Sequence, residues 1–556
     1  MKFLLSILVV VILFIISGKD AHAQVSNWSL VERAGGTEAD LGGDISVDVA
    51  GNIYIIGTFN GTAIFGDSIL TSEGQSDGYF AKFDAAGAFL WVKQFGGADF
   101  DAVNSVSVDV SGNSLITGSF RGSATIDDTT LTSAGGDDIF VAKYDAQGNR
   151  IWVQQAGGTE FFDEGHGIAI DGLDNILVSG AFQGTATFSD TTVTSAGFND
   201  IFLAKYSSQG NLIWVQQAGG TRGDGSNSVA VDISGNCLVT GSFFNTATFN
   251  DTTLIGAGDN DIFVAKYNAQ GNFVWVQQAG GIDLDRGLDI ATDISANTFI
   301  TGFFVGAATF DDTMLTSMGQ SDGFFAKYDG GGNLLWVRQI GGSLSDAVQS
   351  VATDGSGNIY ITGSFQETVT FDDTTLTSAG SADIFVAKYD SQGNLFWVQQ
   401  AGGSVSDGGN SIVMNGSGTA FVTGSFSDTA TFGDTTLTSA GNSDIFIAKI
   451  EEITTGIGAS GKKPESIQLF PNFPNPFNPV TTIQYYLPKS TNVELKIYNI
   501  LGQEVKTLVK ARQPAGKQQL TWDGRDSFGK AVSSGIYIYQ FRAGDFTKSR
   551  KMLLIR

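Results

Sequence analysis

The sequence predicts an all-β protein, a seven-bladed β-propeller followed by a small C-terminal β-sandwich. Three observations support this prediction. Seven of the eight tryptophans recur every 61 to 63 residues: Trp28, Trp91, Trp152, Trp214, Trp275, Trp336 and Trp397. Short alternating apolar runs are separated by Gly-Asn turns without any helical period. The sign of the charge reverses after residue 450, which indicates a separate domain.

Composition excludes several functional classes before any motif is considered. A length of 556 residues suggests two to four domains, and a composition of 42% hydrophobic and only 16% charged residues provides enough apolar material for a large core. A single cysteine excludes an intrachain disulfide and a zinc ribbon. The formal net charge of −26 repels phosphates, so nucleic-acid binding is not expected.

The N-terminus has the pattern of a secretory signal peptide. Lys2 precedes an apolar run from residue 3 to 16, and Ala21-His22-Ala23 provides an A-x-A cleavage site. The alternative is a membrane anchor, but the run is shorter than the roughly 20 residues that span a bilayer. We therefore expect residues 1–23 to be removed and the mature chain to be exported through the periplasm without a transmembrane segment.

Residues 24–450 consist of units of about 61 residues, each with four predicted strands. In the unit that begins at Trp214 these are Ser228–Asp232, Cys237–Phe243, Ile262–Tyr267 and Phe273–Gln278. Gly-Asn pairs favour hairpin turns because both residues tolerate positive φ. Four antiparallel strands per unit are typical of one propeller blade. The Thr-Ala-Thr-Phe…Thr-Thr-Leu stretch between the second and third strands is predicted to form an extra hairpin.

The two ends of the repeat array are complementary. The array begins with a lone fourth strand, Trp28–Arg33, and ends with a lone third strand, Asp444–Ile450. Pairing of these two strands would complete a seventh blade and remove the open sheet edges that otherwise promote aggregation. An open solenoid would need distinct capping units, and none is visible in the sequence.

The repeated phrase SVAVDISGNCLVTGSF…DIFVAKYNAQGN resembles the bacterial seven-bladed β-propeller repeat known as SBBP. The resemblance covers residues 28 to 450. It implies the fold but no activity, since proteins with this repeat are exported or surface proteins without shared chemistry.

The C-terminal part is predicted to be an independent domain. Residues 451–466 lack a strand pattern and are interpreted as a linker, and residues 467–556 as the domain. From residue 464 onward there are 13 Lys and Arg against 6 Asp and Glu. Six alternating runs predict an antiparallel sandwich: Thr482–Leu487, Val493–Ile500, Gln503–Val509, Lys517–Trp522, Ile536–Phe541 and Phe546–Leu554.

The motifs of this domain are similar to those of a known family. They are Phe473-Pro474-Asn475-Pro476-Phe477-Asn478-Pro479, Thr482-Ile483-Gln484-Tyr485, Ile497-Tyr498-Asn499-Ile500-Leu501-Gly502-Gln503, Trp522-Asp523-Gly524 and Ser534-Gly535-Ile536-Tyr537. They resemble the type A C-terminal sorting domain of type IX secretion, which is close to the Ig-like domain of the flagellar hook-capping protein. The resemblance implies that residues 467–556 contact the type IX machinery and that the protein is secreted or attached at the outer surface. The alternative is an Ig-like spacer or adhesive module.

One aspartate recurs in each loop before the innermost strand of a unit. These loop aspartates are Asp40, Asp101, Asp163, Asp224, Asp285, Asp346 and Asp407. Seven carboxylates around a channel are a candidate ring for a hard cation such as Ca²⁺, which prefers six to eight oxygen ligands. The alternative, which we favour, is that each aspartate accepts backbone N–H bonds and fixes its own loop. No cofactor is therefore expected.

Other recurring residues are interpreted as structural. A second aspartate, for example Asp232, ends the innermost strand in six units, and Asn415 takes its place in the last one; in its Asp-x-x-Gly-Asn context it is predicted to be a turn residue. A lysine in each third strand, for example Lys266, is expected to be buried beside a carboxylate or carbonyl. The tryptophans are expected to pack between blades.

The loop at 161–166 differs from its six counterparts by one extra residue. It contains Asp163, Glu164 and His166, which together are a candidate for metal binding or acid–base chemistry. Units elsewhere have Asn or Gln at the position of His166, so a polar side chain is ordinary there.

Cys237 lies on a strand predicted to be interior and is interpreted as a small hydrophobic residue.

The sequence thus favours a non-enzymatic exported scaffold that binds an extracellular glycan or protein through its loops. The alternative is a secreted hydrolase that acts on polysaccharide with a carboxylate pair, since that chemistry requires only Asp or Glu. Near-identical loops favour the scaffold, because an enzyme normally breaks the symmetry of its repeats at one site.

Overall fold

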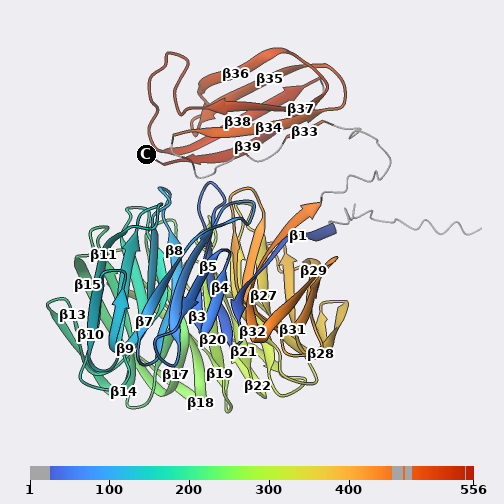
Figure 1. Ribbon diagram of the computed structural model, residues 1–556. Coiled ribbons are helices and arrows are strands. Elements are labelled where there is room, and N and C mark those ends of the chain that lie inside the picture. Colours follow the sequence, from blue (N-terminus) through green and yellow to red (C-terminus); the bar gives the residue numbers. More distant parts are fainter. Residues whose placement is uncertain are drawn as a thin grey trace, which may run out of the picture.

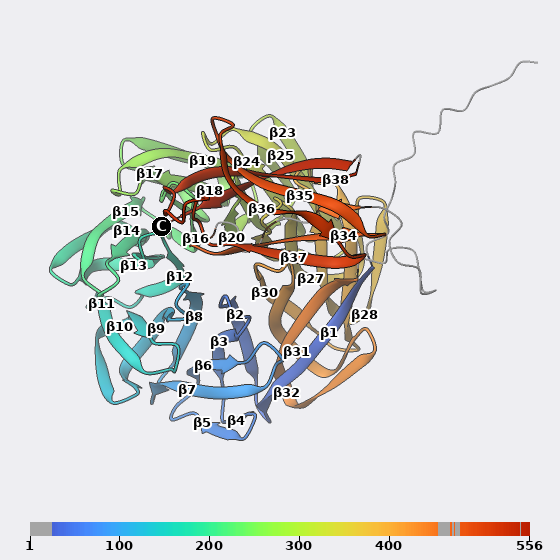
Figure 2. The same ribbon diagram turned by 90° about the horizontal axis from the view of Figure 1, so that it is seen from above.

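The computed structural model describes residues 25–453, 467–469, 472, 477, 479–544 and 546–555. The predicted signal peptide, nearly all of the linker, most of the 473–479 motif and Arg556 lie outside these residues. All secondary structure elements in the described part are strands, as the sequence predicts. Strands β1–β32 form a ring of blades around a central channel, and β33–β39 form the C-terminal domain (Figures 1 and 2).

The first two strands of each blade form its channel side. The innermost strands contact one another around the ring; they are β2 (Asp40–Val47), β8 (Asp101–Val108), β12 (Glu164–Ile170), β16 (Gly225–Val231), β20 (Arg286–Thr292), β26 (Ala347–Thr353) and β30 (Gly408–Met414). The second strands are β3 (Ile53–Phe59), β9 (Ser114–Ile126), β13 (Ile176–Phe188), β17 (Cys237–Phe249), β21 (Thr298–Phe304), β27 (Ile359–Phe371) and β31 (Ala420–Phe432).

The third and fourth strands complete the blade toward the outside. The third strands are β6 (Asp77–Phe83), β10 (Thr129–Tyr144), β14 (Thr191–Tyr206), β18 (Thr252–Tyr267), β24 (Asp322–Tyr328), β28 (Thr374–Tyr389) and β32 (Thr435–Ile453). The outermost strands are β7 (Phe89–Gly97), β11 (Arg150–Gly158), β15 (Leu212–Gly219), β19 (Phe273–Gly281), β25 (Leu334–Gly342), β29 (Leu395–Gly403) and β1 (Val25–Gly36).

The predicted extra hairpin joins neighbouring blades. In five blades it is continuous with the second and third strands, which are therefore longer than predicted. In two blades it consists of separate strands, β4 (Thr62–Phe65) with β5 (Ser68–Thr71) and β22 (Ala307–Phe310) with β23 (Thr313–Thr316). The hairpin pairs with the end of the outermost strand of the preceding blade. In the second blade, for example, Thr125 of the hairpin lies opposite Gly96 of β7. Backbone hydrogen bonds thus connect each blade to the next.

The seventh blade is assembled from both ends of the array, which confirms the predicted closure. Strand β1 pairs antiparallel with β32, so that Trp28 lies opposite Ile450 and Arg33 opposite Phe446. Arg33 Nη1 also donates to Asp444 Oδ2 at 2.6 Å. Residues more than 400 positions apart therefore form one four-stranded sheet.

The hydrophobic core lies between blades. One cluster contains Val239 and Phe263 of the fourth blade together with Leu177 and Leu203 of the third. Each blade buries apolar residues on both faces, so no blade has a complete core by itself. The tryptophans pack at these junctions: Trp214 lies against the turn glycine Gly271 of the next blade.

The C-terminal domain is a two-sheet sandwich with its own core. One sheet contains β33 (Gln468–Leu469), β34 (Thr481–Leu487) and β37 (Gly516–Trp522), and the other contains β36 (Glu504–Gln513), β35 (Thr491–Asn499), β38 (Gly535–Ala543) and β39 (Phe546–Leu554). All residues of its core cluster, including Trp522 and Phe541, belong to the C-terminal domain. Within the described residues, no helix is long and apolar enough to cross a membrane.

Candidate functional site in the central channel

One residue from each innermost strand lines the channel. The residue type at this position differs between blades, so the repeat symmetry is broken there. This channel ring consists of Asp44, Ser105, Gly167, Ser228, Asp289, Ser350 and Ser411. Serine is the common residue, and two blades have aspartate instead. The ring borders a small polar cavity of about 140 Å³. Asp44 and Asp289 are not among the residues predicted from the sequence; both stand out when the seven units are aligned at this position.

Asp44 joins its blade to both neighbouring blades. Its carboxylate accepts hydrogen bonds from Ser411 Oγ at 2.6 Å and from Ser105 Oγ at 2.9 Å. It also accepts from the backbone N–H groups of Ile45 and Val106. Burial raises the pKa of Asp44, and these four donors oppose that effect because they favour the charged form.

Asp289 repeats this arrangement elsewhere in the ring. Ser228 Oγ and Ser350 Oγ each donate to its carboxylate at 2.7 Å. The N–H groups of Ile290 and Val351 complete four donors. Burial raises its pKa as well. Each carboxylate is therefore held in one orientation and connects three blades.

In four blades the side chain of the residue before the channel-ring position also bonds to the next blade. Asn104 Nδ2 donates to Gly165 O, Asn227 Nδ2 to Gly287 O, and Asn410 Nδ2 to Gly42 O, at 2.7 to 2.9 Å. His166 occupies the same position, and its Nδ1 lies 2.7 Å from Ser226 O. Because a carbonyl oxygen only accepts, Nδ1 is protonated and donates this hydrogen bond. The histidine thus takes the structural role that asparagine has in three other blades.

Of the three candidate residues in the 161–166 loop, the structure brings Glu164 and His166 together, whereas Asp163 is not part of this pair. His166 Nε2 lies 3.0 Å from Glu164 Oε2, and both side chains are about one-quarter exposed. Asp163 accepts from Gly158 N and Gln183 N instead. Among the described residues there is no group of three or more His, Cys, Asp and Glu arranged to hold a metal.

The loop aspartates all have the same local geometry. Each carboxylate accepts one N–H from the preceding Gly-Gly segment at 2.6–2.8 Å and another, at 2.8–3.2 Å, from the point where the second strand leads into the extra hairpin. In Asp224 these donors are Gly220 and Phe244. This arrangement favours the interpretation that each aspartate fixes its own loop. Cation binding by the ring stays the untested alternative.

A second set of seven buried aspartates, not predicted from the sequence, lies beside the loop aspartates. These strand aspartates are Asp77, Asp138, Asp200, Asp261, Asp322, Asp383 and Asp444. Among the described residues, Oδ1 of each has no hydrogen-bond partner. A Cβ on Gly35 would lie 2.7 Å from Asp444 Oδ1 and 2.9 Å from Asp40 Oδ2. A side chain at this glycine would clash with both carboxyl groups, so the Gly-Gly motif leaves room for two adjacent aspartates.

These neighbouring carboxyl groups have strongly perturbed pKa values. Burial raises the pKa of Asp40, Asp101 and Asp224 to about 7. The negative charge of a nearby strand aspartate contributes to this rise in the pKa of each loop aspartate. Hydrogen bonds from backbone N–H groups oppose the shift.

The remaining predicted residues are structural. Lys205 Nζ lies 2.8 Å from Asp171 Oδ2 and donates to Ala269 O in the next blade, so the buried lysine is paired as expected. Asp232 Oδ1 accepts from Ser234 N and Asn236 N, which confirms the predicted turn. Cys237 is fully buried, and burial raises the pKa of its thiol to about 12.

Comparison with known proteins agrees with this architecture. Residues 335–364 match the Beta-propeller repeat family (SBBP), and residues 479–545 match the FlgD Ig-like domain. The chain is thus a seven-bladed β-propeller protein with a C-terminal Ig-like domain.

Two curated relatives are distantly similar. The Uncharacterized WD repeat-containing protein L264 of Acanthamoeba polyphaga mimivirus is 24% identical over 446 residues, which cover 64% of this chain and 32% of that protein. The Regulatory protein FlaEY of Caulobacter vibrioides is 25% identical over 203 residues, 34% of this chain and 21% of its own length. The chain therefore spans a third or less of each relative.

Similar solved structures include PorZ, a surface component of the type IX secretion system of Porphyromonas gingivalis, at 13% identity and a TM-score of 0.23. That match covers 94% of this chain and 71% of PorZ. A puromycin hydrolase is 10% identical with a TM-score of 0.34, over 81% of this chain and 59% of its own. TM-scores this low support no functional assignment.

Proposed function

We propose that this protein is an exported, non-enzymatic binding scaffold that the type IX pathway delivers to the cell surface or the medium. The observation that carries the proposal is the combination of a symmetric, closed propeller with an Ig-like C-terminal domain that has a separate core. Such a C-terminal domain fits a secretion address, since it can be recognised without unfolding the propeller.

The channel geometry supports binding more than catalysis. Each channel carboxylate already accepts four hydrogen bonds, and His166 occupies a position where asparagine serves equally well. A glycosidase would need carboxyl groups that are free to exchange protons with a substrate. Polysaccharide hydrolysis is therefore the less supported alternative.

The delivery part of the proposal is tested by removing residues 464–556 in the native host. We expect the shortened protein to fold and to accumulate in the periplasm, whereas the full chain reaches the surface or the medium. Normal surface delivery of the shortened protein would contradict the proposal. The control is the same chain with Phe528→Ala, a highly exposed residue of the C-terminal domain, which should be delivered normally.

The binding part is tested with residues 24–450 on arrays of glycans and surface proteins, together with a polysaccharide hydrolysis screen. We expect a bound glycan or protein and no turnover. Turnover that is lost in both Asp44→Asn and Glu164→Gln variants would instead support the hydrolase.

A further inference from the structure

The turns at one end of the channel expose an unusual set of aliphatic side chains. They lie in the turns after the innermost strands of the first five blades, and four of them directly follow the aspartate at the end of the strand, whereas Gly172 separates the fifth, Leu173, from Asp171. We call them the apolar arc: Val49, Val110, Leu173, Ile233 and Ile294. Each side chain is between 41% and 82% exposed. The corresponding turns of the sixth and seventh blades have glycine, Gly355 and Gly416.

Turn apices are normally polar, because their side chains face water. Five aliphatic side chains around one channel mouth are therefore more than scattered surface hydrophobic residues and indicate a contact surface. The loop aspartates lie at the opposite ends of the same strands, so the apolar arc belongs to the other face of the propeller.

The C-terminal domain presents a matching apolar residue to this face. Strand β39 alternates so that Met552 and Leu554 are buried, and Ile555, which follows its end, remains 43% exposed. Ile555 N donates to Phe477 O, which fixes this segment at the edge of the domain.

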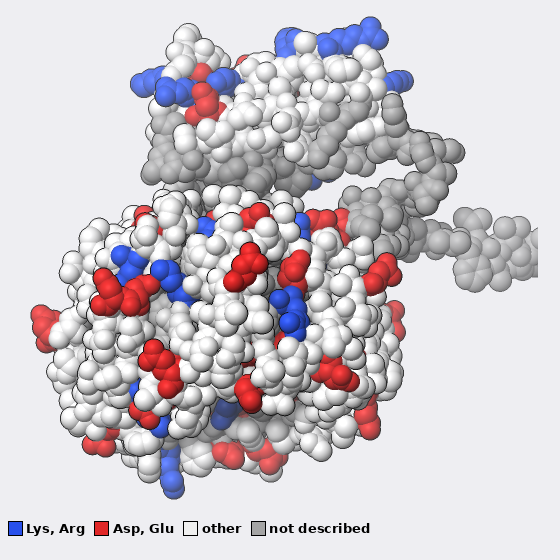
Figure 3. Space-filling view, viewed as in Figure 1, with Lys and Arg blue, Asp and Glu red and all other residues white. Residues whose placement is uncertain are grey.

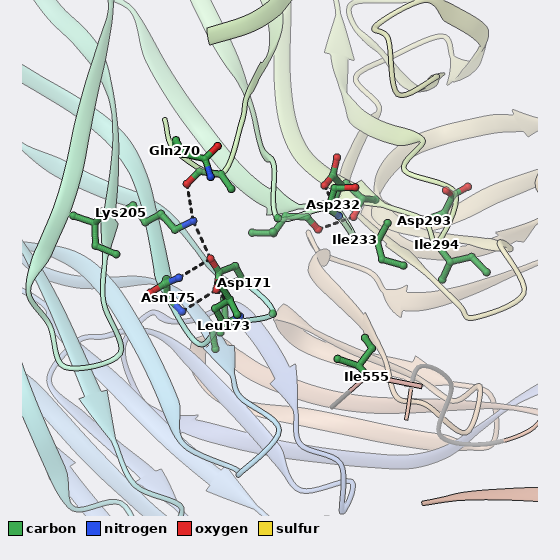
Figure 4. Close-up of a pocket in the computed structure, with 18 residues that line it drawn as sticks. Asp171, Leu173, Asn175, Lys205, Asp232, Ile233, Gln270, Asp293, Ile294 and Ile555 are labelled. Atoms are coloured by element: carbon green, nitrogen blue, oxygen red, sulfur yellow. Dashed lines mark hydrogen bonds and ion pairs between the residues drawn. The ribbon is translucent and has the colours of Figure 1, made fainter. Parts of the chain in front are cut away.

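Two hollows lie between the arc and this segment. One, of about 650 Å³, is lined by Leu173, Ile233, Ile294 and Ile555. The other, of about 610 Å³, is lined by Val49, Val110, Phe477 and Ile555. In the first hollow Ile555 faces the turn residues of the propeller from the opposite side (Figure 4).

Charge and connectivity also favour this partner. In the view of Figure 3, most of the visible Lys and Arg side chains of the C-terminal domain stand away from the propeller. The linker places the domain at an effective concentration of about millimolar, so a modest apolar contact suffices.

We propose that the apolar arc is the docking surface for the C-terminal domain of the same chain, with Ile555 as its central contact. Docking covers part of one channel mouth and leaves the face with the loop aspartates open. A ligand of the propeller then binds on the open face, or on the arc only after the C-terminal domain moves away.

The first test is cross-linking within the full exported chain. Leu173→Cys with Ile555→Cys is treated with a short bis-maleimide, and the native Cys237 is buried and does not compete. The matched control is Ile69→Cys with Ile555→Cys, since Ile69 is 67% exposed and lies in the outer hairpin. We expect the first pair to cross-link at least fivefold more than the control. Equal yields, or none in either pair, would overturn the proposal.

The second test is small-angle scattering of a Leu173→Asp, Ile294→Asp variant, with Ile255→Asp as the control on an exposed site outside the arc. Thermal unfolding first shows that both variants are folded. We expect a larger radius of gyration only in the arc variant, and the compact wild-type form to persist at high salt because the contact is apolar. A wild-type chain as extended as the arc variant would overturn the proposal.

Discussion

At the scale of single residues, the channel ring shows how one position can be filled by different side chains. Ser105 Oγ accepts the N–H of Ile168 in the next blade, and Asp44 accepts the N–H of Val106 in the same way. Aspartate adds bonds from the serines on both sides. The carboxylates therefore strengthen the closure of the ring at two of its seven positions.

Substitutions at Asp44 should separate these roles. We expect Asp44→Ser to cost less than about 1 kcal/mol in the free energy of unfolding, because serine can still accept the N–H of Val106. Asp44→Ala should cost about 2–3 kcal/mol, because it leaves that N–H group and two serines without an acceptor. Denaturant unfolding measures both values; equal losses would contradict this account.

The aspartate pairs predict an unusual pH dependence. Burial raises the folded-state pKa of five loop aspartates to about 7, whereas an unfolded aspartate titrates near 4. Between these values the folded state binds more protons than the unfolded state, so stability falls as pH rises. We expect the melting temperature to decrease from pH 5 to pH 8. Asp224→Asn should reduce the slope, and a melting temperature that rises over this range would refute the assignment.

The choice between loop fixation and cation binding can be settled at Asp224. If the aspartate only accepts the N–H groups of Gly220 and Phe244, Asp224→Ala should cost about 1–3 kcal/mol, and calcium and magnesium should have equal, small effects. A melting temperature that rises with calcium alone, and no longer rises in an Asp224→Ala, Asp285→Ala double variant, would establish a cation site.

At the scale of elements, the pairing of β1 with β32 decides whether the ring is closed. Strand β1 covers the outer edge of β32, and Trp28 packs edge-on against Phe432 of the same blade at 5.2 Å between ring centroids. Without β1, the long edge of β32 would be free to pair with another molecule.

We therefore expect removal of residues 24–36 to cause concentration-dependent aggregation, measured by light scattering. A chain that lacks only residues 464–556 keeps β1 and should remain monomeric under the same conditions. Monomeric behaviour of both chains would show that β1 is not needed to protect the edge.

At the scale of the whole molecule, two separate cores are joined by a linker. The core of the C-terminal domain contains no propeller residue among those described, whereas each propeller core cluster draws on two adjacent blades. The propeller should therefore unfold as one cooperative unit and the C-terminal domain as another.

Calorimetry of the full chain should accordingly show two transitions. Removal of residues 464–556 should abolish one transition and shift the other by only a few degrees, since the apolar arc provides a small contact area. If the full chain shows only one transition and the shortened chain shows none, the two domains do not unfold independently.

The sequence by itself determined the blades, their number, the closing strands and the separate C-terminal domain. These features are local or periodic: the tryptophan spacing, the Gly-Asn turns and the alternation of β39 can be followed along the chain. Only the tertiary structure decided the channel contacts, the aspartate pairs and the apolar arc. Asp44 meets Ser411, 367 residues away, only when the ring closes. Asp40 and Asp444 likewise become neighbours through the pairing of the two ends, so no local pattern records their contact.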